Sequence, residues 1–154
     1  MAWVSRPSAK ISQVIILDTN VVSALMQSER NAGLEQWLNR KPPEIFWLTA
    51  VSYFELRVGI ERLATGQRRQ RLEDALDRVL ELRIQNEILP LDESAARAAA
   101  SIAAARERIG RPVEFRDTLI AGIAVANRAE LATRNVRHFQ DLDISVINPF
   151  EQEP

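Results

Sequence analysis

Short apolar runs alternate along the chain with longer segments in which apolar residues recur every three or four positions. Continuous apolar runs predict buried strands, and the helical repeat predicts amphipathic helices. The runs lie near residues 14–17, 45–48, 87–91, 131–133 and 144–147, and the helical segments near 21–26, 31–40, 50–64, 67–83, 92–109 and 115–127. Strands that alternate with helices indicate an α/β domain. We therefore expect a short parallel sheet of about four or five strands with helices on both faces.

Polar residues follow the first predicted strand directly, as Asp18, Thr19 and Asn20. Right-handed crossovers bring the carboxyl ends of parallel strands to one edge of the sheet, which predicts that Asp18, Thr49 and Thr133 share that edge. Ligand and catalytic sites of open α/β sheets lie there. The competing interpretation is structural, since Asp, Thr and Asn are all good caps for the helix that follows.

The length of the chain and its residue types limit the number of domains and the kinds of catalytic or metal site it can have. A chain of 154 residues suits one domain, which we place at 14–150, after a polar arm at 1–13 and before a tail at 151–154. The chain has no cysteine, which excludes disulfides, zinc–thiolate sites and thiol catalysis. With His138 as its one histidine, a metal ion would need oxygen ligands, which favours Mg²⁺ or Mn²⁺.

The net charge of −1 does not by itself indicate nucleic-acid binding. The basic residues are nevertheless nearly all arginine, the side chain that pairs best with phosphate. We find no apolar run of membrane-spanning length, and residues 1–13 lack the apolar centre of a signal peptide. We expect a cytoplasmic protein.

Two further carboxylates lie on predicted helix faces that are otherwise apolar. Glu55 follows Val51 by four positions, and Asp117 precedes Ile120 by three. A buried charge is costly unless it is paired or bound to a metal ion. Each residue also has a structural alternative: Ser52 and Glu55 match a capping box, and Asp117 suits the first turn of a helix.

Asp18, Glu55 and Asp117 would repel one another if they converge, so they require a compensating cation. Divalent ions between carboxylates activate water and stabilise the leaving oxygen in phosphodiester hydrolysis. We interpret Asp92 as a helix cap and Asp141 and Asp143 as solvated turn residues.

Four blocks of sequence, in this order and spacing, resemble the PIN-domain family and within it the VapC-type toxins. They are Ile16-Leu17-Asp18-Thr19-Asn20, Thr49-Ala50-Val51-Ser52-Tyr53-Phe54-Glu55-Leu56, Asp117-Thr118-Leu119-Ile120-Ala121 and Thr133-Arg134-Asn135-Val136-Arg137-His138-Phe139. The resemblance implies a single PIN-like domain. It also implies a metal-dependent endoribonuclease that hydrolyses RNA phosphodiester bonds, is inhibited by a cognate antitoxin and forms a homodimer.

The resemblance also implies roles for individual residues. It makes Asp18, Glu55 and Asp117 the catalytic and metal-binding acids, with Mg²⁺ or Mn²⁺ as the cofactor. The predicted supporting groups are Thr19, Asn20, Thr133 and Asn135, and the predicted RNA phosphate contacts are Arg116, Arg134 and Arg137. Many relatives carry a further acid in the fourth block where this chain offers Asn135. We therefore expect one metal ion at rest and a second that arrives with RNA.

The amphipathic segment at 67–83 is the predicted place for the antitoxin, although the same stripe would suit a helix that faces the core. Two other functions stay open. A PIN-like module with weak or lost catalysis could bind only RNA or protein. A haloacid-dehalogenase-like phosphatase would also carry Asp after an apolar strand, but Asn20 stands where that class needs a second Asp.

Overall fold

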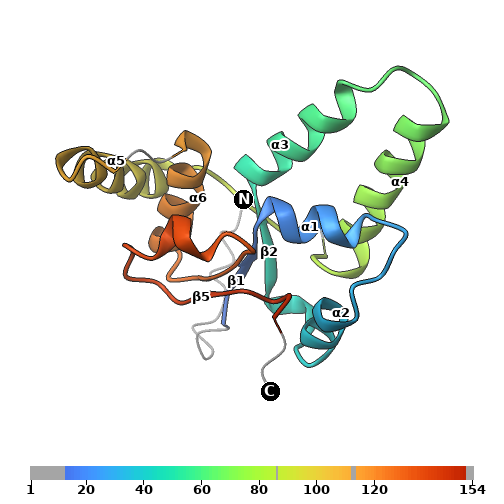
Figure 1. Cartoon of the computed structure of the whole chain (residues 1–154), viewed down its shortest axis with the longest axis horizontal. Coiled ribbons are helices and arrows are strands. Elements are labelled where there is room, and N and C mark those ends of the chain that lie inside the picture. Colours follow the sequence, from blue (N-terminus) through green and yellow to red (C-terminus); the bar gives the residue numbers. More distant parts are fainter. Residues whose placement is uncertain (1–12, 86, 112–113, 152–154) are drawn as a thin grey trace, which may run out of the picture.

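The five predicted strands pair into one parallel sheet at the centre of the molecule (Figure 1). The computed structural model describes residues 13–85, 87–111 and 114–151. Along the sheet the order is β3 (Ile88–Leu89), β2 (Phe46–Thr49), β1 (Ile15–Leu17), β4 (Glu130–Ala132) and β5 (Val146–Ile147). All neighbouring strands run parallel, which confirms the predicted parallel sheet. The predicted arm, except Gln13, and the end of the predicted tail lie outside the described residues.

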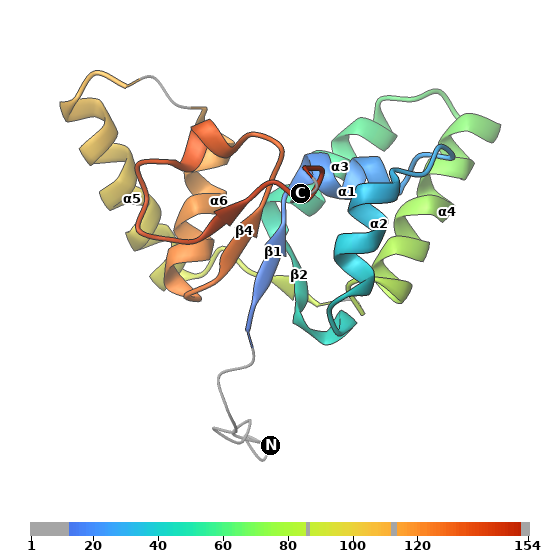
Figure 2. The same cartoon turned by 60° about the horizontal axis from the view of Figure 1, so that its bottom comes forward.

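Helices cover both faces of this sheet, as predicted (Figure 2). On one side lie α1 (Thr19–Leu25), α2 (Ala32–Asn39), α3 (Ala50–Glu61) and α4 (Gln67–Leu82). On the other lie α5 (Glu93–Arg108) and α6 (Phe115–Ala126). Two short 3-10 turns, η1 (Pro43–Ile45) and η2 (Val136–Phe139), were not predicted.

The central strand β1 supplies both halves of the core. Successive side chains of a strand point to opposite faces. Ile15 and Leu17 accordingly pack into the cluster with α1 to α4, and Ile16 packs into the cluster with α5 and α6. All three are fully buried, which is why the sequence shows an unbroken apolar run rather than an alternating one.

The apolar stripe of α4 faces this core. Leu76, Val79 and Leu80 are buried in the same cluster as Leu56 and Ile60 of α3. Of the two interpretations of the 67–83 segment, the core-facing helix is the one observed, and the stripe is not an open groove for a partner. Within the described part of the chain, no helix is both long and apolar enough to span a membrane.

The carboxyl edge of the sheet brings together residues that are far apart in sequence. Leu17 of β1 lies beside Ala132 of β4 in the register, and the Asp18 amide donates to the Ala132 carbonyl at 2.9 Å. Asp18 and Thr133 therefore leave their strands as neighbours, as the sequence predicts. Thr49 ends the adjacent strand β2 and becomes the cap of α3.

Candidate active site

Asp18 lies at the centre of the candidate site, between the end of β1 and the start of α1. It is the N-cap of α1, with Oδ1 accepting from the Thr19 amide at 2.8 Å. Its other oxygen, Oδ2, accepts from Thr133 Oγ1 at 2.7 Å and from Asn20 Nδ2 at 3.4 Å. Only 4% of the residue is exposed. The capping interpretation of Asp18 is confirmed, and the same carboxylate keeps its second oxygen for contacts within the candidate site.

The predicted supporting groups Asn20 and Thr133 link α1 to the end of β4. Thr133 is fully buried, and its Oγ1 also accepts from the Asn135 amide at 3.0 Å and from Asn20 Nδ2 at 3.3 Å. The Asn20 carbonyl oxygen Oδ1 accepts from the Arg134 amide at 3.1 Å. This network fixes the orientation of the Asp18 carboxylate and the path of the segment at 133–135.

Glu55 reaches the site from α3. Thr49, rather than Ser52, caps this helix, because Thr49 Oγ1 accepts from the Ser52 amide at 3.0 Å. The capping-box interpretation of Ser52 and Glu55 is therefore wrong, since Ser52 is already inside the helix. Glu55 instead accepts from Thr19 Oγ1 at 3.2 Å and from Arg116 Nη1 at 3.3 Å.

Asp117 reaches the site from the first turn of α6. Its Oδ2 lies 2.6 Å from Nδ1 of His138, in η2. Because a carboxylate only accepts hydrogen bonds, Nδ1 is the donor of this pair. The side chain of Asp117 is 13% exposed, whereas that of His138 is 48% exposed. The sequence predicted Asp117 at an inward position but gave no sign that His138 would be its partner.

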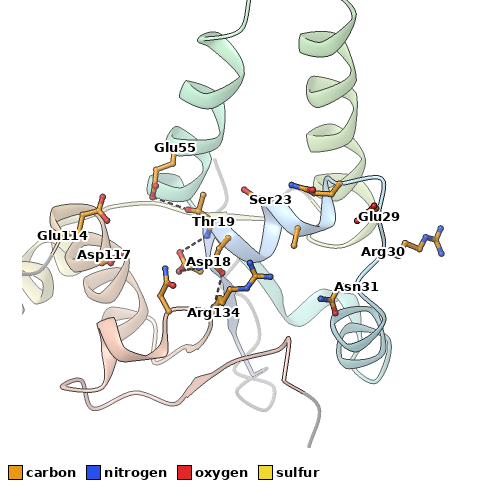
Figure 3. Close-up of a pocket in the computed structure, with 14 residues that line it drawn as sticks. Asp18, Thr19, Ser23, Glu29, Arg30, Asn31, Glu55, Glu114, Asp117 and Arg134 are labelled. Carbon is orange, nitrogen blue, oxygen red and sulfur yellow. Dashed lines mark hydrogen bonds between the residues drawn. The ribbon is translucent and has the colours of Figure 1, made fainter.

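One polar cavity of about 680 Å³ contains all three carboxylates (Figure 3). It extends from Glu55 and Asp117 past Asp18 and along α1 to the connection between α1 and α2. Its lining residues are Asp18, Thr19, Asn20, Ser23, Ala24, Gln27, Glu29, Arg30, Asn31, Glu55, Glu114, Asp117, Arg134 and Asn135. The lining has five carboxylates and two guanidinium groups, so the cavity is acidic.

Burial raises the pKa of two acids of the site, Asp18 and Glu55. Burial raises the pKa of Asp18 to about 6, and the charges of Asp117 and Glu55 act in the same direction. The hydrogen bonds from Thr133 and the Thr19 amide oppose this rise. Burial also raises the pKa of Glu55, and the nearby Arg116 opposes it. A cation in the cavity would favour the charged form of both groups.

The three predicted phosphate contacts occupy different positions. Arg134 lines the cavity, and its guanidinium lies 3.9 Å from the centre of the Phe150 ring. Arg116 pairs with Glu55 and Glu114, and its side chain is half exposed. Arg137 is exposed. Among the described residues that line the cavity, only Arg134 comes from this predicted set.

The donor atoms suit a hard divalent cation, because carboxylate oxygens are the ligands that Mg²⁺ and Mn²⁺ prefer. In this structure, however, the carboxylates lie further apart than the ligands of a bound ion would. Across residues 13–85, 87–111 and 114–151, no three acidic or histidine side chains are grouped closely enough to hold an ion. Glu55 turns toward Thr19 and Arg116, and Asp117 turns toward His138. An ion held by all three acids would require Glu55 and Asp117 to turn away from these partners.

The sequence analysis missed an ion pair behind the site, between a buried arginine and a more exposed aspartate. Arg106 of α5 is 2% exposed, and its Nε and Nη2 donate to the two oxygens of Asp141 at 2.8 and 2.9 Å. Asp141 lies in an exposed turn, as predicted, but its carboxylate is paired with Arg106 rather than free in solvent, and the hydrogen bonds from Arg106 lower its pKa. A signal was present: Arg106 continues the helical spacing of the buried residues Ala95 and Ala99.

Comparison with known proteins agrees with this geometry. Residues 15–144 match the PIN domain family. The plasmid stability protein StbB of Pseudomonas syringae pv. tomato is 35% identical over 90% of this chain and 99% of its own length. The VapC ribonuclease Y4jK of Sinorhizobium fredii is 31% identical over 90% and 99%. The crystal structure of FitAcB from Neisseria gonorrhoeae is 31% identical, covers 90% of this chain and 100% of that one, and has a TM-score of 0.76.

The family match extends over nearly the whole described domain and includes all four sequence blocks that carry the resemblance. The strand order and the placement of the three acids at one sheet edge fit the same assignment. The chain therefore belongs to the PIN-domain family, in its branch of VapC-type toxins.

Proposed function

We propose that this protein is a metal-dependent endoribonuclease and the toxin of a toxin–antitoxin pair. The observation that carries the proposal is the convergence of Asp18, Glu55 and Asp117 on one acidic cavity from β1, α3 and α6. The raised pKa of Asp18 supports it, because such perturbation is common where carboxylates serve a chemical task.

The ligands of the divalent ion would be Asp18, Glu55 and Asp117, with Mg²⁺ or Mn²⁺ as the cofactor. When bound, the ion supplies a more acidic water and positive charge for the phosphodiester. The protein's own groups do the rest: Thr133 and Asn20 hold Asp18 in place, and Thr19 holds Glu55. Asn135 adds no charge, so one tightly bound ion before RNA arrives remains our expectation.

RNA is the proposed substrate because the chain is 31% identical to a protein named as a VapC ribonuclease. Arg134 is the proposed phosphate contact, since it lines the cavity and its guanidinium is held over Phe150. Arg116 and Arg137 remain secondary candidates at exposed positions. A cytoplasmic location is part of the same proposal.

The antitoxin and the homodimer are proposed from membership of the VapC-type branch. An antitoxin would have to cover or enter the acidic cavity, and its basic side chains would complement the five carboxylates of the lining. The apolar stripe of α4 is buried in the core, so an antitoxin that docks along this helix would contact its other faces, such as the hollow lined by Arg71, Asp74 and Arg78.

The decisive experiment is cleavage of a defined RNA panel by tag-free protein purified without antitoxin, in Mg²⁺, Mn²⁺ or EDTA. We expect cleavage that needs the divalent ion and falls by about 100-fold or more in Asp117→Asn. The matched control is Asp92→Asn: Asp92 caps α5 by accepting from the Ala95 amide at 2.9 Å, and Asn caps equally well.

Two results would contradict the proposal. Cleavage that persists in EDTA would rule out metal dependence, and full activity in Asp117→Asn would rule out this site. If no RNA in the panel is cut, growth after induced expression of Asp18→Asn separates the alternatives. Toxicity that survives the change would favour a PIN-like module that only binds RNA or protein.

A further inference from the structure

Arg106 joins three segments behind the cavity without reaching it. Its Nη1 donates to Thr118 Oγ1 of α6 at 3.1 Å, and its Nη2 donates to the His138 carbonyl at 2.8 Å. The fork to Asp141 described above holds the far end of the same turn. One buried guanidinium therefore ties the end of α5 to α6 and to the segment at 138–141.

The two acceptors that Arg106 binds besides Asp141 are next to the Asp117–His138 pair. Thr118 follows Asp117 on α6, and the His138 carbonyl belongs to the residue whose ring contacts Asp117. Arg106 thus holds the backbone of His138 directly and that of Asp117 through the neighbouring Thr118. A second arginine strengthens the turn, since Arg111 Nη2 donates to the Arg137 carbonyl at 2.5 Å and its Nη1 lies 3.7 Å from Asp141 Oδ1.

The buried charge of Arg106 and the shape of its guanidinium require these particular contacts. A guanidinium that is 2% exposed must keep its partners, because an unpaired buried charge is strongly destabilising. Its planar set of donors fits a carboxylate and two further acceptors at fixed angles. A lysine would keep the charge, but its single ammonium group cannot reproduce the fork to Asp141 together with both other contacts.

We infer that Arg106 is a positioning residue that sets the orientation of the Asp117 carboxylate through Thr118 and His138. This inference rests on the proposed function for its consequence, since Asp117 is a proposed metal ligand. Partners of metal ligands affect metal affinity by about 10- to 100-fold when they are removed. Arg106 lies one contact further away, so we expect an effect near the lower end of that range.

The single histidine offers a direct measurement. Because His138 is the only histidine in the chain, its ring nitrogens can be identified without assignment in a tag-free protein. Long-range ¹H–¹⁵N spectra of the metal-free protein report whether Nδ1 carries the proton and is held in a hydrogen bond. This readout depends neither on RNA cleavage nor on bound metal, so it stands if the proposed function fails.

The test compares wild type, Arg106→Lys and Arg83→Lys. Arg83 is the matched control, since it also joins helices, through Asn39 at 3.1 Å and through Glu35, but on the α2–α4 side of the molecule. We expect Arg106→Lys to shift the His138 nitrogens toward those of a free imidazole and to weaken calorimetric Mn²⁺ binding about 10-fold. Arg83→Lys should leave both unchanged, whatever its effect on thermal stability.

Unchanged His138 signals in a folded Arg106→Lys would overturn the inference. If that variant does not fold, Asp141→Asn decides, because it weakens the fork from a side chain that is 21% exposed and keeps the same shape. It should shift the His138 signals in the same direction by less, and wild-type signals would count against the inference. Wild type that binds no Mn²⁺ would contradict the proposed function, while the nitrogen spectra would still test the position of His138.

Discussion

Thr133 Oγ1 donates a 2.7 Å hydrogen bond to Asp18 Oδ2, between residues 115 positions apart in sequence. This contact joins the ends of the adjacent strands β1 and β4, and it lowers the pKa of Asp18 against the stronger effect of burial. Thr133 therefore favours the charged form of Asp18 near neutral pH and also orients its carboxylate.

The first prediction concerns Thr133→Val, which keeps the shape of the side chain and removes the hydroxyl. The pKa of Asp18 should rise above about 6, since one of the interactions that lowers it is lost. RNA cleavage should then fall near pH 6.5, because a protonated Asp18 must lose its proton before a cation can bind, and recover at higher pH. Thr133→Ser is the control and should retain the wild-type pH–rate profile. A wild-type profile in Thr133→Val would contradict this role.

The second prediction concerns the stability of the metal-free protein. Folding raises the pKa of Asp18 from 3.8 to about 6, so folding favours its protonated form. The stabilising contribution of that form is complete below pH 3.8 and is lost as the pH rises through about 6. At pH 7.5 the charged group costs about 3 kcal/mol.

Asp18→Asn should therefore increase the free energy of unfolding at pH 7.5 in EDTA by up to about 3 kcal/mol. The difference from wild type should almost vanish near pH 4. Urea unfolding at both pH values measures it, with Asp92→Asn as the control. A variant less stable than wild type at pH 7.5 would show that the charged form of Asp18 does not destabilise the folded protein.

The third prediction concerns the close packing of α5 on α6. A Cβ added to Gly122 would lie 2.5 Å from Ala99 Cβ and 2.6 Å from the Ala95 carbonyl oxygen, so the helices would have to separate. We expect Gly122→Ala to lower the free energy of unfolding by about 1 to 3 kcal/mol. Gly59→Ala is the matched control: its added Cβ would meet nothing within 4 Å, and α3 should gain about 1 kcal/mol. Equal effects of the two changes would contradict the packing argument.

The fourth prediction concerns Ser52, whose hydroxyl is buried and has no hydrogen-bond partner among the described residues. Removing an unsatisfied polar group is neutral or favourable, so Ser52→Ala should leave stability unchanged or raise it by about 1 kcal/mol. Thr49→Ala, three residues earlier, should instead cost about 1 kcal/mol, because it removes the cap that accepts from the Ser52 amide. Thermal unfolding of both variants distinguishes the capping hydroxyl of Thr49 from the unpaired hydroxyl of Ser52.

The sheet and the three acids were predictable because each depends on a local pattern. Ile15, Ile16 and Leu17 form an apolar run that only a strand covered on both faces explains, and Asp18 follows it directly. Parallel connectivity then places the strand ends on one edge. The inward positions of Glu55 and Asp117 followed from helical spacing alone.

The contacts of these acids were not predictable, because they depend on side chains from distant segments. The Ser52–Glu55 spacing matches a capping box, yet the helix begins earlier, at the end of β2, so the cap is Thr49. Asp141 lies in a turn rich in polar residues, and only the packed structure shows that Arg106 of α5 reaches it. Local patterns report which face a residue occupies but not which partner it meets there.

The hydrogen bond between Asp18 and Thr133 also has a consequence during synthesis. The strand next to β1 on this side, β4, emerges only after more than four-fifths of the chain has been made. A nascent or truncated chain that ends before β4 lacks Thr133 and the pairing that holds Asp18. Contacts of such long sequence separation also form late in folding. The arrangement around Asp18 described above therefore cannot form until Thr133 has been synthesised.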